Sequence, residues 1–380
     1  MPATLPEPDD DAQDASRALC REIAARIETS GGWISFAEYM KMALYLPGLG
    51  YYAGGLRKFG EGGDFTTAPE LTPLFGQALA SQVAQVTAAS APVVLEAGAG
   101  SGRLAADLLN ALDRLGATPD RYLIMELSGE LRARQRETIE REASALSGRV
   151  EWLDRLPESF SGCVIANEML DAMPVHAVAW RKEGLMERGV ALGEEGRFAW
   201  SERPAPAFLS AAATELPVAA PFEGEIGLAA LVWVAEWGRR LEKGALLLID
   251  YGLPRHELWH PQRNRGTLRC HYRHRSHDDP FWWPGLSDIT VHVDFTAVAE
   301  AGFEAGLDVL GYASQSAFLM DCGIGELLAA RRETHPKAAG AANVLLAPGE
   351  MGELFKAIAL GRGIEAPLLG FAHGDRLHAL

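Results

Sequence analysis

A glycine-rich turn is the stretch of this chain best suited to bind a ligand. Gly98, Gly100 and Gly102 alternate with small residues after the apolar run 93–95, and leucines recur at helical spacing from 104 to 115. This pattern predicts a short buried strand, a glycine turn and a helix. Such a turn leaves backbone N–H groups open to a ligand, because glycine has no Cβ to block the approach.

The spacing of these glycines separates two classes of nucleotide ligand. A dinucleotide fingerprint needs glycine at its first, third and sixth positions, but the sixth position here is Arg103. Glycines at the first, third and fifth positions, with Glu96 two residues before them, resemble motif I of the class I S-adenosylmethionine (SAM) methyltransferases. We therefore expect Glu96 and the three glycines to bind the cofactor. The alternative is a tight strand-to-helix turn that binds nothing.

Two further acids follow the next predicted strands. The run 121–125 ends in Glu126, and ligands of an open α/β sheet bind beyond the carboxyl ends of its strands. We expect Glu126 to share the crevice of the glycine turn and to accept hydrogen bonds from both ribose hydroxyls. A surface glutamate that caps the following helix is the alternative. Asp154, after the strand at 150–153, is expected either to meet the adenine amino group or to be a surface turn residue.

The groups that act on the methyl acceptor are expected after the fourth predicted strand, residues 163–166. In this type of sheet the end of that strand lies beside the transferable methyl group. Glu168 and Asp171 are three residues apart at an expected helix start, so they would share one face. A carboxylate there orients a guanidinium, localises its charge and takes its proton. Acids that simply favour a helix N-terminus are the alternative.

Two neighbours of these acids complete the predicted site. Asn167 is expected to contact the cofactor and to hold a donor N–H of the acceptor through its side-chain carbonyl. His176 is expected to act as a base for a hydroxyl or amine acceptor, or to be structural. We therefore predict Asn167, Glu168 and Asp171 as the catalytic residues.

The other strand patterns complete an α/β fold. We expect a class I methyltransferase (Rossmann-like) sheet of mostly parallel strands, an N-terminal helical and lid segment, and an inserted antiparallel and helical subdomain. The fifth, sixth and seventh strands are expected at 245–252, 307–310 and 356–360, the seventh being a reversed edge strand.

The expected domain organisation follows from shifts in composition along the chain. Residues 1–17 are expected to be a disordered acidic tail and 18–90 a helical and lid segment. The core is expected at 91–176, 228–252 and 293–365, with antiparallel hairpins and a linker at 177–227 and a basic and aromatic loop region at 253–292.

Composition limits the class of protein and its partners. The 380 residues are 48% hydrophobic and 23% charged, which is typical of globular proteins, and the net charge of −16 disfavours nucleic acid as a partner. No apolar run reaches the length of a membrane span. Four cysteines far apart, without a C-x-x-C pair, indicate a reducing compartment. We expect a bacterial cytoplasmic protein without membrane insertion, either monomeric or homodimeric.

A basic stretch interrupts this acidic chain. Six arginines and several histidines lie between Arg255 and His277, and Glu257 is the one acid among them. The stretch is expected to bind an acidic partner or the SAM carboxylate, or else to pair with acids of its own fold. Three histidines spaced three apart suggest a metal site, but the interleaved arginines would repel a cation, and we expect no metal.

Six sequence blocks, in their order along the chain, resemble the MidA-type family of SAM-dependent methyltransferases. That family includes the mitochondrial complex I assembly factor that methylates an arginine of a complex I core subunit. The blocks are FAEYMKMALYLPGLGYY, GDFTTAPELTPLFG, VLEAGAGSGRLAADLL, NEMLDAMPVH, GTLRCHYRHRSHDDPFWWPGLSDITVHVDF and MGELFKAIAL.

The resemblance implies SAM as the cofactor and a protein arginine as the methyl acceptor, on a respiratory complex I subunit during its assembly. It also implies that Asp64, in the second block, contacts the cofactor. Two alternatives stay open. One is a small-molecule or lipid methyltransferase with the same SAM site, and the other is a non-catalytic assembly factor.

Overall fold

The computed structural model describes residues 5–54, 67–331 and 337–380. These residues form two compact units. Unit 1 contains the described residues of Met1–Phe65, together with Asp171–Ala230 and Arg255–Asp294. Unit 2 contains Leu231–Pro254, Phe295–Leu380 and Thr66–Leu170 where described. Asp64 lies outside the described residues.

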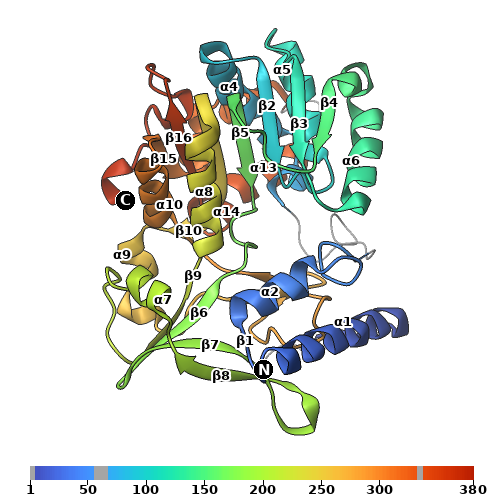
Figure 1. Ribbon diagram of the computed structural model, residues 1–380. Coiled ribbons are helices and arrows are strands. Elements are labelled where there is room, and N and C mark those ends of the chain that lie inside the picture. The colour runs from blue at the N-terminus through green and yellow to red at the C-terminus, as the bar shows by residue number, and fades with distance from the viewer. Residues whose placement is uncertain (1–4, 55–66, 332–336) are drawn as a thin grey trace. The chain divides into compact units, whose positions relative to one another are not determined.

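Unit 2 contains the predicted sheet, with strand order β15-β16-β10-β5-β2-β3-β4 (Figure 1). Neighbours from β10 to β4 pair in parallel, while β16 is antiparallel to both β10 and β15. This is the expected class I methyltransferase sheet. Its strands are β2 Val93–Ala97, β3 Arg121–Met125, β4 Val150–Leu153, β5 Phe160–Asn167, β10 Leu241–Leu253, β15 Asp308–Ser314 and β16 Phe355–Arg362.

The reversed strand is not at the edge, so this part of the prediction is wrong. β16 is inserted between β10 and β15, and β15 forms the edge. β16 pairs antiparallel with β15 on one side, from Asp308 opposite Gly361 to Ser314 opposite Lys356, and with β10 on its other side. β16 is also buried along almost its whole length, as expected for a strand with neighbours on both sides.

Side chains on alternate positions of the strands pack against helices on the two faces of the sheet. Val94 of β2 lies in a buried cluster with residues of α4 and α5, and Gly76 of α4 lets that helix approach Asp107 of α5 closely. On the other face, α8 contributes Trp237 against Phe160 of β5, and α10 packs on β16. The helices are α3 Ala68–Leu71, α4 Leu74–Ala89, α5 Arg103–Arg114, α6 Gly129–Glu142, α8 Leu228–Arg240, α10 Phe295–Glu304, α11 Gln315–Asp321, α12 Ile324–Arg331, α13 Lys337–Leu346 and α14 Met351–Leu354.

Unit 1 is built on antiparallel sheets. One has the order β1-β7-β6-β9 with β8 paired to β7, and the other has the order β12-β11-β13. Its hydrophobic cluster joins the sheets to α1 and α2. The elements are α1 Asp10–Thr29, β1 Ile34–Ser35, α2 Phe36–Tyr45, β6 His176–Arg181, β7 Gly184–Leu192, β8 Phe198–Pro204, α7 Ala207–Ala212, β9 Phe222–Ile226, α9 Arg255–Leu258, β11 Arg269–Tyr272, β12 Arg275–His277, β13 Asp288–Thr290 and β14 Val293–Asp294.

Helix α1 begins inside the segment that the composition predicts to be disordered, so for residues 10–17 that prediction is wrong. Asp9 caps the helix by accepting a hydrogen bond from the backbone N–H of Ala12, and the acids of the first turn complement the helix dipole. Ser16, which is 1% exposed, donates to the carbonyl of Pro284. Contacts with distant parts of unit 1 therefore order the acidic segment.

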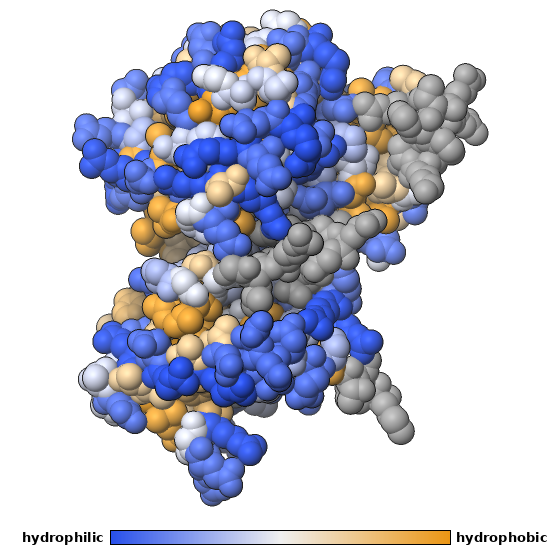
Figure 2. Space-filling model, turned by 90° about the vertical axis from the view of Figure 1, so that its right-hand side faces the viewer, coloured by the Kyte–Doolittle hydropathy of each residue, from blue (hydrophilic) through white to orange (hydrophobic). Residues whose placement is uncertain are grey.

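The face of the molecule in Figure 2 is mainly hydrophilic, with smaller hydrophobic areas between the charged side chains. Such a surface is typical of a globular protein that is rich in acidic residues. Among the described residues, no helix is both long and apolar enough to span a membrane.

Candidate functional site

The glycine turn has the predicted strand–turn–helix geometry. Gly98, Gly100 and Gly102 all have positive φ, at 71°, 52° and 83°, and Gly102 immediately precedes α5. A Cβ at Gly102 would lie 2.9 Å from the Cα of Gln135, and one at Gly98 would lie 3.3 Å from Cγ of Met169. The turn therefore requires glycine both for its backbone conformation and for its close approach to neighbouring segments.

Glu96 lies on the core side of β2 and is 2% exposed. Its Oε2 accepts a hydrogen bond of 2.6 Å from the hydroxyl of Tyr122, which lies on the adjacent strand. Burial raises the pKa of Glu96 from 4.5 to about 7, although the Tyr122 hydrogen bond favours the ionised form. The contact between Glu96 and the cofactor that the motif predicts stays a prediction.

The raised pKa of Glu96 predicts a pH dependence of stability. The folded state holds this proton more tightly than the unfolded chain, so the group favours folding below its unfolded pKa of 4.5. The benefit is lost as the pH rises to the folded pKa of about 7. Glu96→Gln mimics the protonated acid and is expected to remove about 2–3 kcal/mol of this dependence. Urea unfolding of both proteins at about pH 5 and about pH 8 measures it.

Glutamine at this position still offers an oxygen to Tyr122, so the comparison isolates the ionisation. Other buried acids contribute equally to the pH dependence of both proteins. The contribution of Glu96 is therefore the difference between the two proteins in how much their unfolding free energy changes with pH. If wild type and Glu96→Gln lose the same stability between the two pH values, the pKa of Glu96 is not raised in the folded state.

Glu126 and the glycine turn are joined by one side chain. Nε2 of Gln135 donates to the carbonyl of Gly100 at 3.1 Å and to Oε2 of Glu126 at 3.2 Å, while its Oε1 accepts from Trp152. Glu126 Oε1 also accepts the N–H of Ser128, whose own hydroxyl accepts the N–H of Leu131 and caps α6. Burial raises the pKa of Glu126. The sequence contains no signal for the role of Gln135, which depends on how α6 packs beside the turn.

Asp154 has the surroundings of a surface turn residue. Its side chain is 88% exposed and its Oδ1 lies 2.7 Å from Arg132. The same guanidinium donates to the backbone carbonyls of Glu126 and Leu153. Arg132 thus ties together the ends of β3 and β4, and the adenine contact predicted for Asp154 stays a prediction.

The segment after β5 is not helical, so Glu168 and Asp171 do not share a helix face. Glu168 has a φ of 51°, and its N–H donates to the carbonyl of Ile249 in β10. The carboxylate turns to α3, where Oε1 accepts the backbone N–H of Ala68 at 3.0 Å. From Glu168 to Val175 the backbone runs in bends and turns, so no helix forms there.

Asn167 holds the same carboxylate oxygen. Its Nδ2 donates to Glu168 Oε1 at 3.0 Å, and its own Oδ1 is buried without a hydrogen-bond partner among the described residues. The neighbouring α3 also contacts the glycine turn, because Glu70 accepts a hydrogen bond from the Ser101 hydroxyl. The ends of β2 and β5 are therefore connected through one short helix.

Asp250 at the end of β10 fixes the loop that carries Glu168. Its Oδ2 accepts the N–H groups of Met169 at 3.0 Å and Leu170 at 2.8 Å, and its Oδ1 accepts that of Tyr251 at 2.9 Å. No pattern in the sequence predicts a role for this acid, although it ends a strongly apolar run. Its function depends on the parallel pairing of β10 with β5, which brings the two strand ends together.

Asp171 and His176 belong to unit 1. Asp171 is 5% exposed, and its backbone carbonyl accepts the N–H of Val291. His176 Nδ1 lies 2.7 Å from Glu187 Oε1 within the antiparallel sheet, an arrangement that favours the structural alternative for this histidine. A catalytic role of Asp171 stays a prediction.

Three arginines of the basic stretch find partners within unit 1, as one of the two alternatives expects. Arg255 lies near Asp294, Arg273 near Asp9, and Arg263 donates to the carbonyl of Glu257. In the parts of the chain that the structure describes, no group of three His, Cys, Asp or Glu side chains is arranged to hold a metal ion.

The strand order with one reversed strand, and the glycine turn at the end of β2, define a class I methyltransferase. Comparison with known proteins agrees. The family described as "Putative S-adenosyl-L-methionine-dependent methyltransferase" matches residues 74–313. The chain belongs to this family of MidA-type SAM-dependent methyltransferases.

Similar proteins identify the cofactor. A Burkholderia thailandensis protein solved bound to S-adenosyl-homocysteine is 50% identical, with a TM-score of 0.96 over 99% of this chain and 100% of that chain. Curated relatives named protein arginine methyltransferase NDUFAF7, mitochondrial, are 30% identical in Mus musculus, over 90% of this chain and 84% of the relative, and 28% identical in Danio rerio, over 90% and 86%. The chain is a methyltransferase that uses SAM.

Proposed function

We propose that this chain is a protein-arginine N-methyltransferase in which Glu168 and Asn167 bind the acceptor guanidinium. The names of the curated relatives support an arginine acceptor. The family resemblance further suggests that the acceptor is a respiratory complex I subunit. The observation that carries the proposal is the pair of acceptor groups after β5: a carboxylate held by two donors, beside the buried Asn167 Oδ1.

A guanidinium is suited to such a pair because it carries N–H donors and no acceptor. A carboxylate next to it localises the positive charge, orients the attacking nitrogen and accepts the proton that the nitrogen loses. Asn167 Oδ1 would accept a second N–H and so fix the plane of the group. Glu168 Oε1 is held in place by Ala68 and Asn167, so the protein organises the carboxylate before the acceptor arrives.

The residues at the end of β2 and β3 fit the cofactor. When bound, SAM supplies a methyl group activated by a sulfonium charge. Gly98, Gly100 and Gly102 leave room for a ligand beside the backbone, and Glu126 offers a carboxylate to the ribose hydroxyls. Leu127, next to Glu126, is 78% exposed and offers an apolar surface for the base.

Glu126→Gln is expected to weaken binding of S-adenosylhomocysteine about tenfold to a hundredfold, because the two ribose hydroxyls lose the negative charge and one of the two acceptor oxygens of the carboxylate. Calorimetric titration of the purified chain measures the change. Glu130→Gln, an exposed acid in the first turn of α6, is the matched control and is expected to bind like wild type. Equal affinities of the Glu126 and Glu130 variants would contradict a ribose contact.

The acceptor class is tested by transfer of labelled methyl groups from SAM in lysate of a strain that lacks the protein. Label in polypeptide, recovered as methylarginine after acid hydrolysis, is the expected result. Label in the lipid or small-molecule fraction alone would instead support the first alternative. Absence of label in every fraction, with cofactor binding intact, would support a non-catalytic assembly factor.

The compartment proposed for this chemistry is the cytoplasm. All four cysteines are unpaired, and Cys163, Cys270 and Cys322 are buried, as suits a reducing environment. The proposal is checked by fractionation, in which the protein is expected with a cytoplasmic marker.

A further inference from the structure

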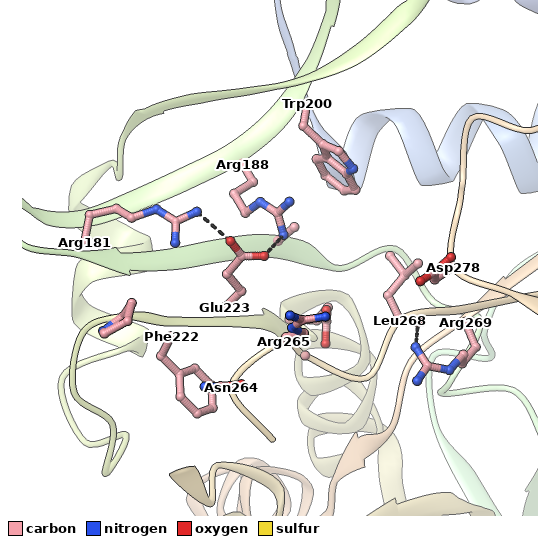
Figure 3. Close-up of a pocket in the computed structure, with 14 residues that line it drawn as sticks. Arg181, Arg188, Trp200, Phe222, Glu223, Asn264, Arg265, Leu268, Arg269 and Asp278 are labelled. Atoms are coloured by element: carbon pink, nitrogen blue, oxygen red, sulfur yellow. Dashed lines mark hydrogen bonds and ion pairs between the residues drawn. The ribbon is translucent and has the colours of Figure 1, made fainter. Parts of the chain in front are cut away.

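A cavity of about 590 Å³ lies within unit 1, formed by β6, β7, β8, β9, the loop before β11, the start of β11 and the residue after β12. Its size is in the range that holds small ligands. Four arginines line it, Arg181, Arg188, Arg265 and Arg269, in a chain whose net charge is −16 (Figure 3). None of these residues has a role in the site proposed above.

One carboxylate of the cavity is fully engaged by two of the arginines. Glu223 Oε1 lies 2.6 Å from Arg181, and its Oε2 lies 2.7 Å from Arg188, as the dashed lines in Figure 3 show. The Nε–H of Arg188 is not hydrogen-bonded among the described residues. This atom is buried and lies 3.8 Å from Glu202 Oε1, beyond hydrogen-bond distance.

A second carboxylate is engaged by neutral donors. Glu225 Oε2 accepts the N–H of Thr267 at 2.8 Å and its hydroxyl at 3.1 Å. Burial raises the pKa of Glu225, so its surroundings oppose its negative charge. Glu225 is thus held by the loop and makes no ion pair with the arginines of the cavity in the part of the chain that the structure describes.

Arg265 in the loop before β11 and Arg269 at the start of β11 form no ion pair among the described residues. Neither Arg265 nor Arg269 has a carboxylate oxygen within 4.0 Å among the described residues; Arg269 donates to the carbonyl of Leu268 at 2.8 Å. Asn264 adds an amide beside them. Asp278 is the third acid of the lining and makes no ion pair with either arginine among the described residues.

We propose that this cavity binds a carboxylate-bearing ligand through Arg265 and Arg269. A guanidinium binds a carboxylate with two parallel hydrogen bonds, and the acids that compete for it in the cavity are already engaged or lie at a distance. The ligand is a free dicarboxylate or an acidic side chain of a polypeptide, because both present the same group.

Titration of the full chain with glutarate and with a hexaglutamate peptide tests the proposal and separates the two sources. Binding of glutarate indicates a free dicarboxylate, and binding of the peptide alone indicates an acidic polypeptide segment. In either case the double variant Arg265→Gln, Arg269→Gln is expected to lower affinity about tenfold or more. Asp278→Asn removes a repulsive charge and is expected to raise affinity about threefold.

The matched control is the double variant Arg17→Gln, Arg197→Gln, which removes two exposed arginines of unit 1 outside the cavity. It is expected to bind the probe like wild type. All variants are expected to bind S-adenosylhomocysteine unchanged, which separates this site from the cofactor site. Failure of both probes to bind, equal losses in the two double variants, or no gain in Asp278→Asn would overturn the proposal.

Discussion

Glu168→Gln is expected to lower the rate of methyl transfer about a hundredfold or more while leaving cofactor affinity within about twofold of wild type. Glutamine keeps an oxygen for the Ala68 N–H and for Asn167, so the local structure is preserved. Glutamine lacks the negative charge that orients the acceptor guanidinium, and it cannot take the proton that the guanidinium loses. Single-turnover transfer to the acceptor polypeptide measures the rate, and calorimetric titration of S-adenosylhomocysteine measures the cofactor affinity.

The rate and the affinity distinguish a catalytic carboxylate from a structural one. Loss of cofactor affinity together with activity would indicate that Glu168 only holds α3 in place. A Glu168→Gln enzyme that transfers methyl at the wild-type rate would remove this residue from the mechanism. Asn167→Ala is expected to have a smaller effect in the same direction, because it removes one neutral hydrogen bond.

The core of unit 2 is predictable from sequence because its strands are short apolar runs that end in polar residues. β2, β3, β4 and β5 lie where the hydrophobic pattern predicts them. The order of the strands cannot be predicted in this way, since β15 and β16 are both mainly apolar runs. Which of them is at the edge depends on pairings with β10 that no local pattern records.

Some residues of the predicted site follow from local sequence patterns, and others depend on long-range packing. Glycine spacing identifies the turn because the positive φ values at Gly98, Gly100 and Gly102 are a local requirement. Gln135 lies in the middle of a charged helix, and only the packing of α6 brings it to Gly100 and Glu126. The helix expected at Glu168 and Asp171 is absent because the backbone turns there to bond with β10, a contact that acidic spacing does not reveal.

Asp250→Asn is expected to reduce the free energy of unfolding by about 2–4 kcal/mol and to reduce methyl transfer and cofactor affinity together. Asp250 accepts three backbone N–H groups, two from Met169 and Leu170 and one from Tyr251. An asparagine in either orientation directs its NH₂ group at some of these donors, leaving buried N–H groups unpaired. The loop after β5 then loses the contacts that fix Glu168 beside α3.

Urea unfolding and single-turnover transfer measure the two effects of Asp250→Asn. Asp308→Asn is the matched control, because this acid begins β15 in the same sheet and is exposed; the control is expected to unfold and react like wild type. Glu168→Gln keeps an oxygen for the Ala68 N–H and for Asn167, so it is expected to leave stability unchanged. Glu168→Gln therefore removes the reacting carboxylate, whereas Asp250→Asn removes the contacts that hold it in place. Wild-type stability and activity in Asp250→Asn would show that the loop is held by other contacts.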